Sequence, residues 1–246
     1  MELIIDGYRV KPQPDQSLLQ IVKSVGLSTG KLSTEPLAAK IAGEVFTLNY
    51  IPVRQKDVQP DALSVRRAMA ASGGVIRLLR YTDPNGKDAY VRTAQFVIFL
   101  ALRQLWPDAV AKMHCTVGAG LHISVSGAED FSAETLKAQV RKIVEADIPL
   151  QRRRISTKEA IAYYESRKQR DKARLLAYRK KETFDIYAYE DFADYFYGEM
   201  APSTGYLRVW DIRPAEGGFM FVFPDDRDPD RIADWQDSPN FFQVYN

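Results

Sequence analysis

The sequence of 246 residues contains one cysteine, Cys115, and two histidines. A single cysteine cannot form an internal disulfide, and it excludes a zinc site made of four thiolates. A lone thiol is typical of proteins kept in a reducing compartment, so we expect a cytoplasmic protein.

The three residues that could serve as soft metal ligands or as a thiol–imidazole pair are His114, Cys115 and His122. Neighbouring residues of a strand point to opposite faces, so His114 and Cys115 do not easily share a metal ion. A cysteine nucleophile would in addition need a base placed beside it. We therefore expect ordinary strand residues here and predict no metal site, with a zinc site or a nucleophile as the alternative.

Long hydrophobic runs are also lacking. The run "FVIFLAL" ends at Arg103 and is far shorter than the stretch of about 18 residues that a membrane helix needs. The start, "MELIIDGYRV", carries an early acid and no apolar core of a secretory signal. We expect no membrane partner, and the 46% of hydrophobic residues suffices for a buried core.

The segment "GLSTGKLST" at 26–34 resembles a phosphate-binding loop but departs from its pattern. A P-loop needs four residues between its first glycine and Gly-Lys-Ser/Thr, so that amides surround a phosphate and a hydroxyl meets Mg²⁺. Here three residues separate Gly26 from Gly30, and Leu32 takes the place of the hydroxyl residue. We predict a connecting loop and no P-loop kinase site in the chain.

Charge is nearly balanced at +2 but unevenly distributed. Residues 151–181 carry twelve lysines and arginines against three acids, whereas 184–246 carry thirteen acids against four arginines. Such asymmetry can indicate a nucleic-acid surface. The alternative is a basic segment that packs beside the acidic one or forms a solvated helix face.

Residues 1–58 have the pattern of a small β-grasp domain. "LIIDGYRV" alternates apolar and polar residues around Asp6-Gly7, which is a strong hairpin signal. Ser17 is a candidate N-cap for a helix through "LLQIVKSV", and Gly26 is a candidate stop. Short strands are expected to follow in "AAKIAGEVFTLNYIPV".

Residues 59–74 are expected to form a connector, and 75–246 a larger α+β region. "VIRLLRY" predicts a strand, "TDPNGKDAY" a turn-rich loop, and the apolar spacing from 92 to 105 a buried helix. "HCTVGAGLHISVSG" and "GYLRVWDIRPAEGGFMFVFP" predict hairpins, and "RRRIS" predicts a strand. Helices are expected in "SAETLKAQVRKIVEADI", with a cap at Ser132, and in "TKEAIAYYESRKQRDKARLLAYR". The chain as a whole is therefore predicted to be α+β.

A family resemblance runs from this β-grasp pattern through "VRTAQFVIFLALRQLWPDAVAKMHCTVGAGLHISV" and "RRRISTKEAIAYYESRKQRDKARLL" to "YEDFADYFYGEMAP". The order resembles the N-terminal region of bacterial threonyl-tRNA synthetases, in which a TGS domain precedes a second additional domain that hydrolyses mischarged tRNA. "LWPDA", "STKEA" and "EDFADYFYGEMAP" anchor the resemblance. It implies a TGS-like domain at 1–58 and a threonyl-tRNA synthetase editing-like α+β domain within 75–246.

The residues on which editing depends in that family are missing. The family uses two histidines spaced by three residues on a helix, and a later cysteine and histidine with the same spacing. The resemblance places the first pair at Arg92 and Phe96 and the second at Phe196 and Met200. None of the four can supply an imidazole or a thiolate, so we expect neither zinc binding nor water activation by them.

The chain is similar to a second group as well. Long bacterial nucleoside kinases of the uridine kinase type carry TGS and synthetase-like modules before a P-loop kinase domain. "SGGVIRLLRYTDPNGKDAYVR", "DYFYGEMAPSTGYLRVWDI" and "GGFMFVFP" resemble that group, and "DSPNFFQVYN" has the pattern of a helix start with Ser238 as cap. We expect a fragment whose partner is a C-terminal kinase domain. ATP and Mg²⁺ would belong to that missing domain, and this chain would need no cofactor.

The first functional hypothesis is a non-catalytic regulatory or ligand-binding region of a uridine-kinase-like protein, the full protein being a nucleoside kinase. The former editing cleft would bind a small ligand, such as a nucleotide, by stacking and one cation. The alternative is that its aromatic residues only fill a disused cavity, since buried apolar side chains add stability. The expected cleft residues are Arg92, Gln95, Phe96, Tyr195, Phe196, Tyr197 and Met200.

The second hypothesis is a stand-alone tRNA- or RNA-binding protein related to threonyl-tRNA synthetase. Its phosphate contacts would come from the basic segment, because neutralised phosphates supply most of the affinity for nucleic acid. A third hypothesis, residual deacylase activity, would require bound zinc. The candidate phosphate contacts are Arg152, Arg153, Arg154 and Lys158.

Overall fold

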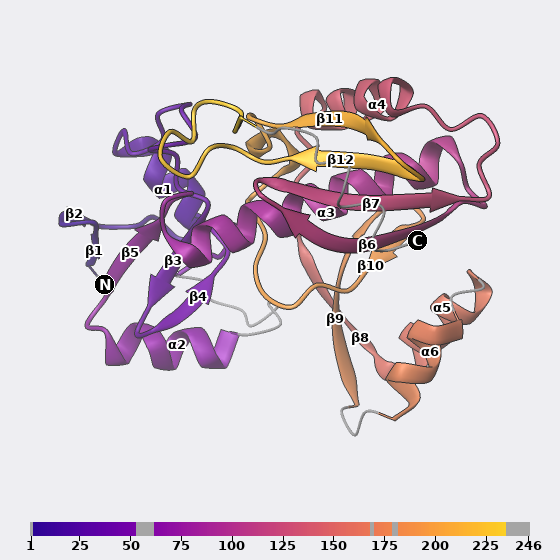
Figure 1. Cartoon of the computed structure of the whole chain (residues 1–246). Helices are drawn as coiled ribbons and strands as arrows, with labels where there is room; N and C mark the ends of the chain where they lie inside the picture. The colour runs from indigo at the N-terminus through magenta and orange to yellow at the C-terminus, as the bar shows by residue number, and fades with distance from the viewer. Residues whose placement is uncertain (1, 53–61, 168–169, 179–181, 235–246) are drawn as a thin grey trace.

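The fold is α+β, as the order of elements in the sequence predicts. A computed structural model describes residues 2–52, 62–167, 170–178 and 182–234, without the side chains of 62–66. Strands in this part of the chain form sheets of five, four and three strands, and a long central helix runs past the first two (Figure 1). The helix expected in "DSPNFFQVYN" lies outside the described residues.

The first sheet has the strand order β2-β1-β5-β3-β4. The predicted Asp6-Gly7 hairpin is confirmed, with φ of +46° and +90° at the two turn residues, the left-handed pair that a tight hairpin requires. Helices α1, Leu18–Ser24, and α2, Ala62–Ala71, accompany this sheet. Its strands are β1 Leu3–Ile5, β2 Tyr8–Val10, β3 Ala38–Ile41, β4 Glu44–Phe46 and β5 Val75–Leu79.

Helix α1 begins and ends where the sequence predicts. The Ser17 hydroxyl accepts a hydrogen bond from the Gln20 amide at 3.2 Å, and the Gln20 side chain accepts one from the Ser17 amide at 2.8 Å. This reciprocal capping box satisfies donors that the first helical turn leaves free. Gly26 has a φ of +72° just after the helix, so it ends α1 as expected.

Strand β5 belongs to the first sheet, although the sequence predicts that the second region starts at Val75. It pairs parallel to β1 through Ile4 and Ile5 and antiparallel to β3 through Ala38 and Ala39. The reason is that its buried residues complete the core under β1 and β3, a pairing across some seventy residues that local patterns cannot show. The division into domains stays a prediction.

Helix α3, Pro84–Leu105, starts earlier than predicted, because "TDPNGKDAY" is mostly helix rather than loop. Asp83 is the N-cap residue, and Pro84 stands at the first helical position, where its missing N–H costs nothing. Gly86 made the segment look like a turn. A Cβ atom there would lie 1.9 Å from the Arg80 carbonyl oxygen, so glycine allows a close backbone approach.

We expect Gly86→Ala to destabilise the protein by about 1–3 kcal/mol, although alanine is the better helix former. The added methyl group would overlap the Arg80 backbone, which is not a flexible side-chain end. Urea denaturation monitored by circular dichroism measures the change. Asn85→Ala at the neighbouring position is the control and should stay within about 0.5 kcal/mol. A Gly86→Ala protein as stable as wild type would contradict the close approach.

The second sheet has the order β11-β12-β7-β6 and is antiparallel throughout. Both predicted hairpins of this sheet are confirmed. Helices α3 and α4, Ala133–Glu145, cover one face of it (Figure 1), and the Ser132 hydroxyl caps α4 as expected. The strands are β6 Val110–Val117, β7 Gly120–Ser126, β11 Asp211–Ala215 and β12 Gly218–Val222.

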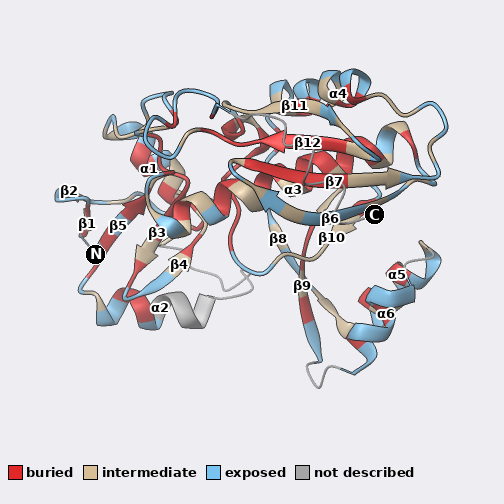
Figure 2. Ribbon diagram, viewed as in Figure 1, coloured by how far each residue is buried: buried red, intermediate tan, exposed pale blue. Residues whose placement is uncertain are grey.

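The third sheet, β10-β9-β8, carries a pair of helices with a small core of its own. The helical segment predicted after "RRRIS" divides into α5, Thr157–Ser166, and α6, Arg170–Ala177, whose outer faces are exposed (Figure 2). The strands are β8 Arg152–Ser156, β9 Thr183–Tyr189 and β10 Phe192–Asp194. A short 3₁₀ helix, Thr204–Tyr206, leads on to β11. None of the helices in the described residues is long and apolar enough to cross a membrane.

Candidate functional site

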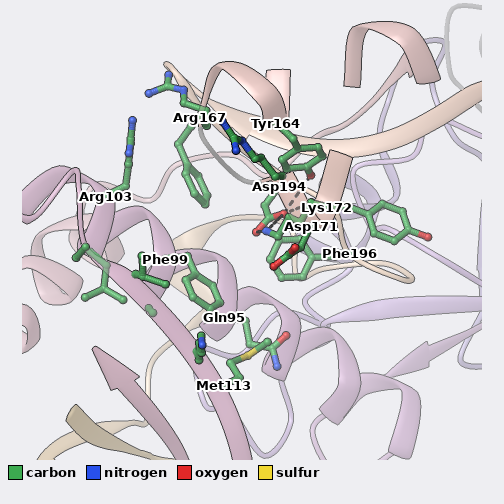
Figure 3. A pocket seen from close by; sticks show the side chains of 18 of the residues that line it. Gln95, Phe99, Arg103, Met113, Tyr164, Arg167, Asp171, Lys172, Asp194 and Phe196 are labelled. Carbon is green, nitrogen blue, oxygen red and sulfur yellow. Dashed lines mark hydrogen bonds and ion pairs between the residues drawn. The ribbon is translucent and has the colours of Figure 1, made fainter. Parts of the chain in front are cut away.

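A large open cleft of about 1890 Å³ separates the second sheet from the helices α5 and α6 (Figure 3). One wall is formed by α3 and the beginning of β6, and the other by α5, α6, β10 and the loop after β10. Pockets for small molecules usually measure about 300–1,000 Å³, so this cleft exceeds the needs of one small ligand.

Five of the seven predicted cleft residues line this cleft: Arg92, Gln95, Tyr195, Phe196 and Tyr197. The other two do not. Phe96 is fully buried and Met200 is 1% exposed, and both belong to the main hydrophobic core. Phe96 lies on the buried face of α3, and Met200 follows the loop after β10. Both side chains pack into the main core instead of facing the cleft.

Arg92 is held in place at the edge of the cleft. Its Nη1 donates to the Glu199 carbonyl oxygen at 3.1 Å, and its Nη2 lies 3.5 Å from Asp88 Oδ2. The guanidinium also lies against Gly198, where a Cβ atom would come within 2.9 Å of Cζ. Gly198 has a φ of +107°, so glycine is needed there for both space and conformation. Arg92 therefore fixes the loop after β10 as well as lining the cleft.

Aromatic rings continue from the core into the cleft. The Phe96 ring meets those of Phe192 and Phe196 edge-on, with centroids 5.3 and 6.1 Å apart. Tyr195 meets Tyr197 edge-on at 4.4 Å. Tyr197 itself is 67% exposed and lines the cleft, so its ring is open to a ligand there. The cleft thus offers an accessible ring on a rigid aromatic base.

Beneath the loop lies a buried polar network around Glu199. Its carboxylate accepts from Tyr187 Oη at 3.1 Å and pairs with Arg152 Nη1 at 3.1 Å. Burial raises the pKa of Glu199, although Arg152 and Tyr187 oppose that effect. The Glu199 side chain is not part of the cleft wall, so this network supports the loop from within.

The cleft wall is rich in cations, of which only Arg92 is predicted from the sequence. Lys172 Nζ lies 2.8 Å from both carboxylate oxygens of Asp194, and Tyr164 Oη donates to Asp194 at 3.2 Å. Arg167 pairs with Asp191 at 2.8 Å. Three carboxylates, Asp108, Asp171 and Asp194, face a larger set of cations. That set is Arg92, Arg103, Lys112, Arg167, Arg170 and Lys172.

The charge excess of 151–181 was the signal that could have located this wall, since Arg167, Arg170 and Lys172 belong to it. The residues chosen from that segment lie elsewhere. Arg152 and Arg154 pair with Asp185, at 4.0 and 2.8 Å, and neither lines the cleft. Arg153 and Lys158 are exposed and also lie outside the cleft lining.

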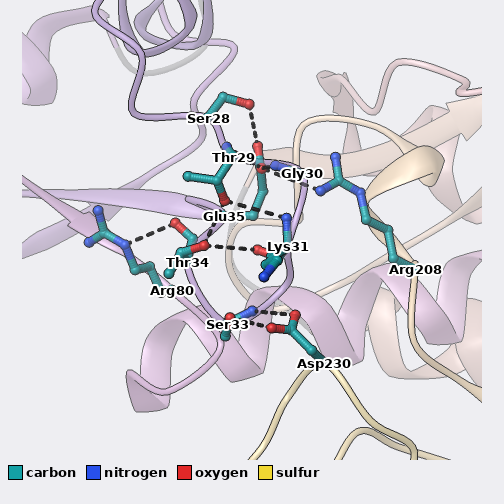
Figure 4. Close-up of polar contacts among 10 residues, drawn as sticks. All are labelled: Ser28, Thr29, Gly30, Lys31, Ser33, Thr34, Glu35, Arg80, Arg208 and Asp230. Atoms are coloured by element: carbon teal, nitrogen blue, oxygen red, sulfur yellow. Dashed lines mark hydrogen bonds and ion pairs between the residues drawn. The ribbon is translucent and has the colours of Figure 1, made fainter.

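The "GLSTGKLST" segment is a loop, as predicted, and it surrounds an anion of the chain itself (Figure 4). The Glu35 carboxylate, in a residue only 1% exposed, accepts from Ser28 Oγ at 2.6 Å and from the amides of Thr29 and Gly30 at 3.0 and 2.7 Å. Arg208, far along the chain, adds an ion pair at 3.3 Å. The amides that would hold a phosphate in a P-loop are used internally here.

His114 and His122 stack across β6 and β7 with ring centroids 5.1 Å apart. Their Nε2 atoms lie 2.7 Å from Ser124 Oγ and 3.2 Å from the Glu216 carbonyl oxygen. Burial lowers the pKa of His122, and the nearby His114 adds to this effect. No group of three or more possible metal ligands occurs within the described residues.

The chain is similar to threonine–tRNA ligases over most of its length. It is 23% identical to that of Syntrophomonas wolfei over 87% of the chain, 24% to that of Acetivibrio thermocellus over 82%, and 26% to that of Desulforamulus reducens over 82%. The chain spans only 29–31% of the length of these relatives. No family model matches it. It is therefore a protein related to threonyl-tRNA synthetases, with the α+β fold expected of an editing-like region.

Proposed function

We propose that this chain is a non-catalytic ligand-binding region of a nucleoside-kinase-type protein, and that its cleft binds a nucleotide. The observation that carries the proposal is the exposed ring of Tyr197 beside the cationic side chains of the cleft. An aromatic face stacks on a base, and arginine or lysine binds phosphate. The four positions that align with the editing residues, Arg92, Phe96, Phe196 and Met200, carry no metal ligand or nucleophile, which supports binding without catalysis.

The link to a kinase rests on the resemblance of "DYFYGEMAPSTGYLRVWDI" and "GGFMFVFP" to long uridine-kinase-like proteins. In such a protein ATP and Mg²⁺ would serve the kinase domain, and the present region would report on nucleotide levels. Reading the coding sequence past Asn246 tests this link. A Gly-x-x-x-x-Gly-Lys-Ser/Thr motif between a predicted strand and helix would support it, and its absence would contradict it.

Nucleotide binding is tested by titrating the chain with UTP, UMP and ATP in a calorimeter. We expect Tyr197→Ala to weaken the binding of UTP by about 1–3 kcal/mol, the usual value of one base stacked on an aromatic side chain. Tyr178→Ala is the matched control, because Tyr178 is 82% exposed and lies outside the cleft lining. Equal losses in both variants, or no binding to the wild-type chain, would contradict the proposal.

RNA binding is the second candidate, favoured by Arg153 and Lys158, which are exposed on β8 and α5. Their charges are available for phosphates, and such contacts weaken steeply with salt. Uncharged tRNA should then bind at low salt and lose affinity in Arg153→Ala. No binding of tRNA at low salt would exclude this candidate.

A further inference from the structure

The strand β6 presents an unpaired edge. Among the described residues it pairs only with β7, at the end of the order β11-β12-β7-β6. Two of its large apolar residues are open to solvent, Val110 at 54% and Met113 at 44%. An exposed strand edge with free N–H and C=O groups is a template for a further strand.

This edge faces the cleft. Five consecutive residues, 109–113, line the cleft, although side chains of neighbouring strand residues point to opposite faces. The series starts in the loop before β6 and continues along the strand, so the backbone of β6 as well as its side chains borders the cleft. The regular part of the edge, Val110–Met113, ends where the pairing with β7 shifts register between Met113 and Thr116. It is about 13 Å long, at roughly 3.3 Å per residue.

The cleft as a whole carries an excess of positive charge, although Arg167 and Lys172 on the wall opposite the edge are paired with Asp191 and Asp194. Six cationic side chains and three carboxylates line the whole cleft, and one of those carboxylates, Asp194, is already paired with Lys172. Leu175, which is 70% exposed, and Tyr197 add apolar surface on the same wall. A nucleotide stacked on Tyr197 would leave much of the 1890 Å³ cleft open.

We propose that an extended acidic peptide segment docks in the cleft as an added strand on β6. Its backbone would pair with the edge at Val110–Met113, and its carboxylates would face cations of the cleft, among them Lys112 on β6 and Arg170 on α6. This inference goes beyond nucleotide binding and does not depend on it, since it rests on the strand edge. A nucleic acid would meet the cations equally well, but it has no backbone amides to pair with the edge.

The test is fluorescence anisotropy with the full chain and a labelled, end-capped peptide of about six residues that alternates valine and glutamate. The same length of alternating valine and lysine should not bind. In an extended strand the glutamate amides point to one edge and the valine amides to the other. N-methylation of the glutamate amides removes the donors on the first edge, and N-methylation of the valine amides removes those on the second. One of the two should weaken binding about tenfold or more, because several backbone hydrogen bonds are lost.

Charge is tested separately with Arg170→Glu, because Arg170 lines the cleft. Lys158→Glu is the matched control outside the cleft. We expect at least about a fivefold loss of peptide affinity for the first and none beyond salt effects for the second. A peptide that binds regardless of its charge or methylation, or fails to bind, would overturn the proposal.

Two further outcomes would also overturn it. A single-stranded oligouridylate that binds wild type and not Arg170→Glu, while the acidic peptide does not bind, would assign the cleft to RNA. A concentration-dependent dimer in sedimentation, with the amides of β6 protected from hydrogen exchange, would assign the edge to a second copy of the chain.

Discussion

Replacing Glu35 by alanine is expected to lower the free energy of unfolding by about 2–4 kcal/mol. The carboxylate is buried and accepts from Ser28, Thr29 and Gly30, and it pairs with Arg208. Its removal takes the acceptor from two partly buried amides and the counter-charge from one arginine. Urea denaturation of the wild-type and variant chains measures the loss.

Asp230→Asn is the control for this prediction. Asp230 also joins the same loop to a distant part of the chain, through Ser33 Oγ at 2.5 Å and the Ser33 amide at 3.1 Å, but on the exposed surface. Exposed polar links of this kind are worth about 0–1 kcal/mol. If the two variants lost the same stability, burial of Glu35 would not be the source of its effect.

The contribution of Glu35 depends on pH. Burial acts to raise the pKa of this carboxyl, but the hydrogen bonds from Ser28, Gly30 and Thr29 and the charge of Arg208 outweigh it and hold the pKa below its ordinary value of 4.5. The folded state therefore favours the ionised form. Its stabilisation is present above pH 4.5 and is lost as the pH falls through the lowered pKa. Glu35→Gln should accordingly lose less stability than wild type on acidification.

Most helices and strands could be predicted from the sequence, because the residues that start and end them are close to one another in the chain. The turn at Asp6-Gly7 and the cap at Ser17 depend on residues within one turn, and both are found as predicted. The start of α3 and the pairing of β5 could not be predicted in the same way. Gly86 serves a contact with the Arg80 backbone, and β5 pairs with strands distant in the sequence.

The site was located only in part for a similar reason. The family resemblance places Phe96 and Phe196 in one site, and in the structure their rings meet at 6.1 Å. It could not tell which side chains face the cleft, because that depends on how the loop after β10 lies over α3. The cations at Arg103 and Lys172 were missed because charge in a helix is common and only its position in space makes it part of a wall.

Truncation of two aromatic residues of the predicted site should affect stability very differently. Phe96→Ala is expected to lower the free energy of unfolding by about 3–5 kcal/mol, because the ring is fully buried among Phe192 and Phe196 and its loss leaves a cavity. Tyr197→Ala should change stability by no more than about 0.5 kcal/mol, because its ring is 67% exposed. Thermal and urea unfolding of both variants give these values.

The comparison separates the two readings of the aromatic cleft. If its rings only fill a disused cavity, then Phe96→Ala costs stability, and Tyr197→Ala leaves nucleotide binding absent or unchanged. If the cleft binds a ligand, then the cost of Tyr197→Ala appears in affinity while stability stays level. A wild-type chain that binds UTP, together with an equally stable Tyr197→Ala chain that binds it more weakly, is expected only if the cleft binds a ligand. Measuring stability and UTP affinity on both chains therefore distinguishes a packed remnant from a working site.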